Sequence, residues 1–168
     1  PPFSDAQRTA IDSLLEDVAD FFVVLAEERG VELVVAAESK GSVRGDATWL
    51  HQLFANLVHN ALQYTPEGGR VTVEARPANG EVLVRVRDTG PGLSEADRAI
   101  AFSRFERGSA SAKGPGLGLG LSLASEIARA HGCDHAIVYT REDVAPRVRE
   151  ITGGKGVPVV YDSVGKDT

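Results

Sequence analysis

Methionine is absent from the 168 residues, and cysteine occurs only once. A single cysteine excludes an intrachain disulfide framework and suits a reducing compartment, so we expect a cytoplasmic protein. Since even the first position lacks methionine, we expect the sequence to be a trimmed piece, or an expression product whose first residues are missing. Aromatic residues make up only 6% of the chain, which predicts a core built mainly from aliphatic side chains.

Excess positive charge and long apolar runs are also missing. Lysine and arginine number 18 against 24 acidic residues, and the net charge of -6 argues against a general nucleic-acid binder. No stretch approaches the ~20 apolar residues of a membrane span, and no signal peptide is recognisable, so we expect no membrane segment. With 42% hydrophobic and 25% charged residues, the chain can build a core of about one domain.

The first half of the chain alternates between helical and extended patterns. Apolar residues recur at three- and four-residue steps in two segments, and every second residue is apolar in two others. Gly30 is a plausible end for the first helix, and Asp46 is a candidate N-cap for the second. The expected elements are a helix over 11–29, a strand over 31–37, a helix over 48–64, and an antiparallel hairpin of strands 70–75 and 81–88.

The second half begins with a glycine-rich turn and ends with a different pattern. We expect a short helix over 94–105, a glycine-dense loop over 107–120 and a helix over 121–130. After Gly132 the order becomes strand, helix, strand, which is a βαβ unit and favours a parallel strand pair. These last elements are predicted over 135–139, 142–151 and 157–161.

Polar side chains form one stripe on the second predicted helix. Asn56, Asn60 and Gln63 follow each other at steps of four and three residues, next to the apolar stripe. Amide oxygens are hard ligands that suit Mg²⁺, so this stripe is a candidate for a metal-triphosphate. Tyr64 is placed to lay its ring against a base. The alternative is that these amides are merely exposed polar residues.

Two glycine-rich segments are candidates for ligand contact. Asp88 ends a predicted strand and precedes Gly90 and Gly92, so its carboxylate can accept a hydrogen bond from an exocyclic amine; a simple tight turn explains the pattern equally well. The glycines of residues 114–120 run into a helix, where free N–H groups favour phosphate, although a plain flexible loop is the alternative.

Two arginines lie between these glycine-rich segments. Arg104 and Arg107 can reach phosphates from there or decorate a solvated helix face. The phenylalanines beside them are most simply core residues.

In this order and spacing, the motifs resemble those of a known family. Residues 45–132 closely resemble the catalytic ATP-binding domain of two-component sensor histidine kinases, within the ATPase superfamily of gyrase, Hsp90 and MutL. Residues 56–66 look like its N box and residues 88–92 like its first glycine box. Residues 102–107 look like its F box, and residues 116–122 like its second glycine box.

This resemblance implies a Bergerat-type two-layer α/β sandwich with a mixed sheet, and it implies ATP and Mg²⁺ as ligands. It places Asn60, helped by Asn56, at Mg²⁺, Asp88 at the adenine amine and Tyr64 against the base, with residues 108–116 as a lid. Two positions depart from the family pattern: Leu117 replaces a small hydroxyl residue, and Gln63 replaces a lysine. The implied nucleotide-binding residues are Asn56, Asn60, Tyr64, Asp88, Gly90, Gly92, Arg104, Arg107, Gly116, Gly118, Leu119 and Gly120.

The phospho-acceptor of the family is a histidine followed by an acidic residue. None of the four histidines, at positions 51, 59, 131 and 135, has an acidic residue after it. The resemblance therefore implies a domain without its own acceptor, with at most weak ATPase activity. It also implies that the parent kinase needs a dimerisation and phospho-acceptor domain and a response regulator as partners.

The C-terminal segment departs from the kinase pattern, which should close with two antiparallel strands. Residues 127–168 instead resemble part of the nucleotide-binding half of NADPH:quinone oxidoreductases, with Tyr139 near the cofactor's 2′-phosphate. We therefore expect a chimera, in which residues 1–131 and 132–168 form one compact domain and the βαβ unit replaces the closing strands.

Three alternatives to this interpretation stay open. The chain can be a natural kinase domain with a divergent C-terminus, a recombined folding scaffold without activity, or a nicotinamide-dependent oxidoreductase fragment. In addition, an exposed strand edge would permit oligomers.

Overall fold

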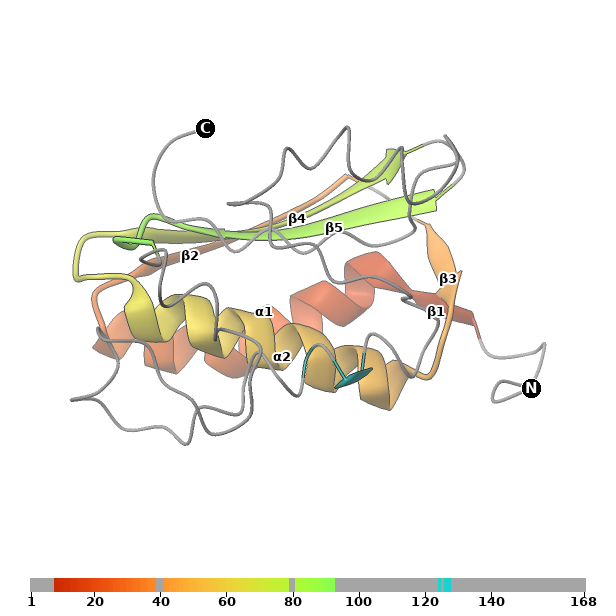
Figure 1. The fold of residues 1–168 in the computed structure, drawn as a ribbon, viewed down its shortest axis with the longest axis horizontal. Coiled ribbons are helices and arrows are strands. Elements are labelled where there is room, and N and C mark those ends of the chain that lie inside the picture. Colours follow the sequence, from red (N-terminus) through yellow and green to blue (C-terminus); the bar gives the residue numbers. More distant parts are fainter. Residues whose placement is uncertain (1–7, 39–40, 79–80, 93–123, 125, 128–168) are drawn as a thin grey trace.

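The computed structural model describes residues 8–38, 41–78, 81–92, 124 and 126–127. In these ranges, two helices lie side by side on one face of a three-stranded sheet, and a small two-stranded ribbon lies at one end of the helices (Figure 1). This arrangement confirms the predicted two-layer α/β fold. The elements are β1 (Arg8–Ala10), α1 (Ile11–Glu28), β2 (Glu32–Ala37), β3 (Ser42–Arg44), α2 (Ala47–Tyr64), β4 (Arg70–Ala78) and β5 (Glu81–Asp88).

The end of α1 follows from the backbone freedom of one glycine. Gly30 has φ +62°, a left-handed conformation that glycine adopts without a Cβ penalty. Its N–H donates to the Glu27 carbonyl at 3.0 Å, and the next N–H, of Val31, donates to the Ala26 carbonyl at 2.9 Å. These bonds satisfy carbonyls that the last helical turn leaves open. The predicted stop at Gly30 is confirmed.

The start of α2 is capped by the predicted residue. Asp46 has an extended backbone, and its Oδ1 accepts hydrogen bonds from the N–H groups of Thr48 at 2.8 Å and Trp49 at 3.3 Å. The carboxylate thus satisfies two donors that the first helical turn cannot pair, and its charge is favourable beside the helix N-terminus.

The sheet is mixed, as predicted. β2 pairs with β4 in parallel, from Glu32 opposite Arg70 onward, and β4 pairs with β5 antiparallel, from Val71 opposite Asp88 onward. The hairpin prediction is confirmed, although β4 continues to Ala78, beyond its predicted end. The β1–β3 ribbon was not predicted.

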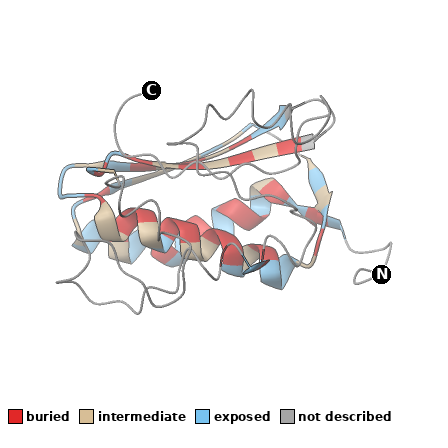
Figure 2. Ribbon diagram, viewed as in Figure 1, coloured by how far each residue is buried: buried red, intermediate tan, exposed pale blue. Residues whose placement is uncertain are grey.

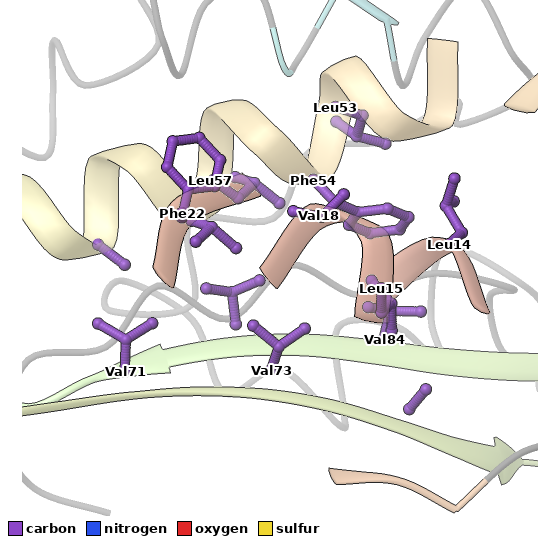
Figure 3. Packing of buried hydrophobic residues seen from close by; sticks show 14 of the residues in the cluster. Leu14, Leu15, Val18, Phe22, Leu53, Phe54, Leu57, Val71, Val73 and Val84 are labelled. Atoms are coloured by element: carbon purple, nitrogen blue, oxygen red, sulfur yellow. The ribbon is translucent and has the colours of Figure 1, made fainter. Parts of the chain in front are cut away.

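The core lies between the helices and the sheet, where side chains from both layers interdigitate (Figure 3). Along β5, buried and half-buried residues alternate, as expected for a strand with one face on the core (Figure 2). Val58 and Leu62 extend the buried face of α2 beyond the apolar stripe that the sequence predicts. All residues of that predicted stripe are themselves buried: Leu50, Leu53, Phe54, Leu57 and Ala61. The largest fully buried side chains are Phe54, Ile11, Leu15, Leu62, Val18, Val58, Val71, Val73 and Val84.

Several predicted elements lie outside the described residues. They are the helix over 94–105, the loop over 107–120 and the βαβ unit after Gly132. Of the helix predicted over 121–130, only residues 124, 126 and 127 are described, and all three are helical. Ala124 and Ile127 are buried in the same core cluster as α1 and α2. None of the described helices has the length and apolarity that a membrane span requires.

Candidate nucleotide site

The polar stripe on α2 contains one buried donor that has no partner. Asn56 and Asn60 are both half-buried and lie one helical turn apart. The side-chain oxygen of Asn56 accepts a long hydrogen bond, 3.5 Å, from Gln52 Nε2. Its Nδ2 is shielded from solvent and makes no hydrogen bond. A buried unpaired donor costs about 1–3 kcal/mol, so this amide is suited to an acceptor that binds there.

The C-terminal end of α2 is held by side chains from two directions. The hydroxyl of Thr65 donates to a carbonyl one turn earlier at 2.7 Å. Nη1 of Arg29, just after α1, lies 3.5 Å from the carbonyl of Leu62 and 3.4 Å from that of Gln63. The two contacts of Arg29 reach carbonyls that a helix end leaves open, and its cationic guanidinium is favourable beside the negative end of the helix dipole. The backbone at Tyr64, the last residue of α2, is therefore fixed.

Asp88 ends β5 in a turn that is tied to the start of β4. Its carboxyl group is buried, with the residue 9% exposed, and Oδ1 accepts a hydrogen bond from Gly90 N at 2.8 Å. The intervening Thr89 makes two bonds to Arg70: its N–H donates to the carbonyl at 3.0 Å, and its hydroxyl oxygen accepts from the N–H at 2.9 Å. Three hydrogen bonds thus fix the direction in which the chain leaves the sheet.

The turn and the helix end touch at Gly90. A Cβ at this glycine would lie 2.8 Å from the carbonyl oxygen of Tyr64 and 2.8 Å from Asp88 Oδ1, so no larger residue fits without displacement. Gly92, two residues on, has φ +76°, which also favours glycine. Both predicted glycines therefore have structural reasons to be glycine. In Figure 1, the end of α2 and the end of β5 lie at the same end of the molecule, away from the β1–β3 ribbon.

Six of the predicted nucleotide-binding residues are thus described. Tyr64, Asp88 and Gly90 meet at one place, and Asn56 and Asn60 occupy the two preceding turns of α2. Gln63, at the position where the resemblance implies a lysine, is half-buried beside them. The remaining predicted residues lie outside the described part of the chain: Arg104, Arg107, Gly116, Gly118, Leu119 and Gly120.

Positioning residues were missed by the sequence reasoning. Arg29 and Thr89 hold the two backbone segments of the site. Arg29 lies outside every predicted motif, and Thr89 lies inside the predicted first glycine box without a role assigned to it. A basic residue directly after a helix can bind carbonyls of another helix, but the sequence does not say which helix lies beside it. The Thr65-Pro66 pair was noted as part of a motif, and the structure assigns the threonine hydroxyl to the helix end.

The donor set of this site limits the metal it can hold. In the described ranges, no group of three or more histidine, cysteine or acidic side chains is arranged to bind a metal ion. A metal here would depend on amide oxygens and on oxygens of a bound ligand. That combination fits Mg²⁺, which keeps several waters and uses few protein ligands. The Nδ2 group of Asn56 fits a phosphate oxygen or a metal-bound water better than the metal itself, since it is a donor.

The fold and the motif order together define a class of ATPase. Residues 45–159 match the family of histidine kinase-, DNA gyrase B- and HSP90-like ATPases, and the chain belongs to this family. Among individual proteins, it is 37% identical over 119 residues to the sensor protein kinase PmrB of Pseudomonas aeruginosa. This alignment covers 71% of the chain but only 25% of PmrB, so the chain spans about a quarter of that relative.

Solved structures of histidine kinases share the fold. The catalytic domain of histidine kinase ThkA is 25% identical with a TM-score of 0.66, over 77% of this chain and 82% of that one. Full-length ShkA, solved in complex with AMPPNP, is 33% identical with a TM-score of 0.63, over 73% of this chain and 25% of that one. The Bergerat-type fold expected from the resemblance is therefore confirmed.

A shorter similarity points to a different enzyme. Over 44 residues, the chain is 66% identical to a 2-haloacrylate reductase of a Burkholderia species. The aligned segment is 26% of this chain and 13% of the reductase.

Proposed function

We propose that this chain is the cytoplasmic Mg-ATP-binding domain of a two-component sensor histidine kinase, and that it offers the γ-phosphoryl group to a histidine on another domain. The observation that carries the proposal is the contact between the Asp88 turn and the end of α2 at Gly90. That contact joins a buried carboxylate to the helix that bears the unpartnered Asn56 amide. Family membership and the AMPPNP complex of ShkA support the same ligand class.

Each residue has a distinct role in this proposal. Asp88 accepts a hydrogen bond from the exocyclic amine of adenine, and Tyr64 lies beside the base. Asn60 supplies an amide oxygen to Mg²⁺, while Asn56 donates to a phosphate oxygen or a metal-bound water. Mg²⁺ neutralises phosphate charge when bound, and the protein contributes mainly by positioning the groups.

The phosphate end is assigned to residues outside the described ranges. Backbone N–H groups of the second glycine box contact the phosphates, and two arginines add positive charge. Without an acceptor histidine of its own, the chain has at most slow ATP hydrolysis. Transfer requires a dimerisation domain carrying the acceptor histidine, and a response regulator receives the phosphoryl group afterwards. The residues assigned to the phosphates in this proposal are Gly116, Gly118, Leu119, Gly120, Arg104 and Arg107.

Isothermal titration calorimetry with ATP, with and without Mg²⁺, tests this function. Asp88→Asn should weaken ATP binding roughly tenfold to a hundredfold, because a hydrogen bond to a charged group contributes ~1.5–3 kcal/mol. Asn60→Ala should remove most of the benefit of Mg²⁺ while leaving metal-free ATP binding nearly unchanged.

Matched controls exist for both variants. Glu74→Gln changes an acidic residue of β4 whose position alternates with the core-facing residues Val73 and Ala75, and it should leave binding unchanged. His59→Ala changes the exposed neighbour of Asn60 and should also be neutral. If Asp88→Asn and Asn60→Ala bind Mg-ATP as tightly as these controls, the proposed site is wrong.

A second proposal concerns the origin of the tail. We propose that residues 132–168 derive from a reductase and replace the closing strands of the kinase domain, so that residues 1–131 and the tail fold as one unit. The short, highly identical reductase alignment supports this origin, although the family match itself continues to residue 159.

Such a tail should have no reductase activity, because it lacks the glycine-rich dinucleotide turn. A fluorescence titration should therefore detect no NADPH binding. Binding at micromolar NADPH would overturn the proposal and favour an oxidoreductase. A chain that binds neither ATP nor NADPH would favour a folding scaffold without activity.

A further inference from the structure

The outward side of α1 combines strong negative charge with exposed apolar side chains. The helix has no basic residue, and its acidic residues are Asp12, Glu16, Asp17, Asp20, Glu27 and Glu28. Within the described ranges, none of these carboxylates makes an ion pair. Phe21 is 72% exposed and Val24 is 60% exposed, although both lie in the middle of a well-formed helix.

Four of these residues form one stripe. Asp17, Phe21, Val24 and Glu28 follow at steps of four, three and four residues, which places them along a single line on the helix surface. The stripe is apolar at its centre and acidic at both ends. We call these four residues the α1 stripe. The core-facing positions of α1, such as Val18 and Phe22, lie on the side that packs against α2 and the sheet.

Phe21, the phenylalanine of the α1 stripe, contacts a buried aromatic ring of the same helix. The ring of Phe21 meets that of Phe22 edge to face, with centroids 5.0 Å apart and an interplanar angle of 85°. Phe22 is buried and also contacts the His59 ring of α2 at 6.0 Å. The ring contact with Phe22 restricts the side chain of Phe21. A side chain that is already restricted loses less conformational freedom when a partner covers it, so Phe21 is suited to act as an anchor.

We propose that the α1 stripe is a docking surface for a basic amphipathic helix of a protein partner. The step of the stripe matches the 3–4 spacing with which one helix packs along another. Phe21 and Val24 would meet apolar residues of the partner, and Asp17 and Glu28 would meet its lysines or arginines. The negative charge of α1 favours a basic partner over the alternatives. A second copy of α1 would place carboxylates against carboxylates, and an anionic membrane surface would repel the helix.

The probe for the experiment is a synthetic peptide of about three heptads, with leucine at positions a and d and lysine at e and g. Calorimetry should detect its binding to the full 168-residue chain, and NMR shift changes should map to α1. Phe21→Ala should weaken binding about tenfold, as at other interface anchors. Asp17→Asn combined with Glu28→Gln should weaken it further at low salt, and the difference should shrink as salt rises toward ~1 M.

Val23→Ala is the matched control, since Val23 is 45% exposed on the opposite flank of the same helix. It should leave peptide affinity unchanged. All of these changes are at the surface, and ATP binding provides an independent measure of folding that the proposal does not affect. Equal weakening by Val23→Ala and Phe21→Ala, or equal binding of a peptide with glutamate at e and g, would overturn the proposal. Self-association of the chain that Phe21→Ala abolishes would also overturn it, in favour of a second copy.

Discussion

At the scale of single residues, Gly90 controls the distance between the Asp88 turn and α2. Its backbone leaves no room for a Cβ, which would meet the Tyr64 carbonyl and the Asp88 carboxylate, each at 2.8 Å. Gly90→Ala should therefore push the turn away from the helix end. Overpacking of this kind costs about 1–3 kcal/mol, and denaturant unfolding should show the loss. ATP affinity should fall together with stability, since the adenine contact depends on the same turn.

Gly68 is the matched control at this scale. It has φ +81°, but a Cβ there would meet no atom within 4 Å. Gly68→Ala should lower stability by about 1 kcal/mol through backbone strain alone, and it should leave ATP affinity unchanged. If the two alanine variants affect ATP affinity equally, the contact at Gly90 does not shape the site.

At the scale of the element, α2 depends on its N-cap because it carries the polar stripe of the site. Asp46→Ala removes the acceptor for two backbone N–H groups and should lower the free energy of unfolding by about 1 kcal/mol. Asp46→Asn keeps an acceptor oxygen and should lie close to the parent. Thermal and denaturant unfolding of both variants would measure the difference. Equal losses for alanine and asparagine would contradict the capping role.

The elements could be predicted in proportion to their length and pattern. Both long helices and the hairpin were predicted, because their apolar residues repeat over several turns or strand pairs. β1 and β3 were missed, since each has three residues and pairs across more than 30 residues of chain. Three residues carry too little periodicity to indicate a strand. The pairing of β1 with β3 also depends on how α1, which lies between them in the sequence, is placed in the fold. Val58 was missed because it lies at the edge of the expected apolar stripe.

The site could be predicted only in part for a similar reason. Asn56, Asn60 and Tyr64 lie on one helix, so their spacing alone places them on neighbouring turns. The contact between Tyr64 and the Asp88 turn is different, because it joins residues that are more than 20 positions apart. Only the resemblance to a known family indicated that they meet. The role of Arg29 needed the structure, because it depends on how α1 packs beside α2.

At the scale of the whole molecule, the core does not end with the β4–β5 hairpin. Ala124 and Ile127 are 2% and 4% exposed in the same cluster as α1, α2 and the sheet. Ile127→Ala should lower the free energy of unfolding by about 2–5 kcal/mol, because it removes methyl groups from a packed core and leaves a cavity. A loss below about 1 kcal/mol in denaturant unfolding would show that this residue does not contribute to the core.

The tail beyond Gly132 is expected to contribute to the stability of the whole domain, and truncation can measure this contribution. It contains apolar residues at strand-like and helical spacing, including Ile137, Val138, Val148 and Ile151. Burying several such side chains, at ~1.5–3 kcal/mol each, would contribute as much free energy as the usual net stability of ~5–15 kcal/mol for a domain. Truncation after Gly132 should therefore give an aggregating or molten chain. Such a chain keeps its far-UV circular dichroism but loses its near-UV signal and its cooperative unfolding. Cooperative unfolding and parental ATP affinity in the truncated chain would mean that the described core, with Ile127 in place, is sufficient without the tail.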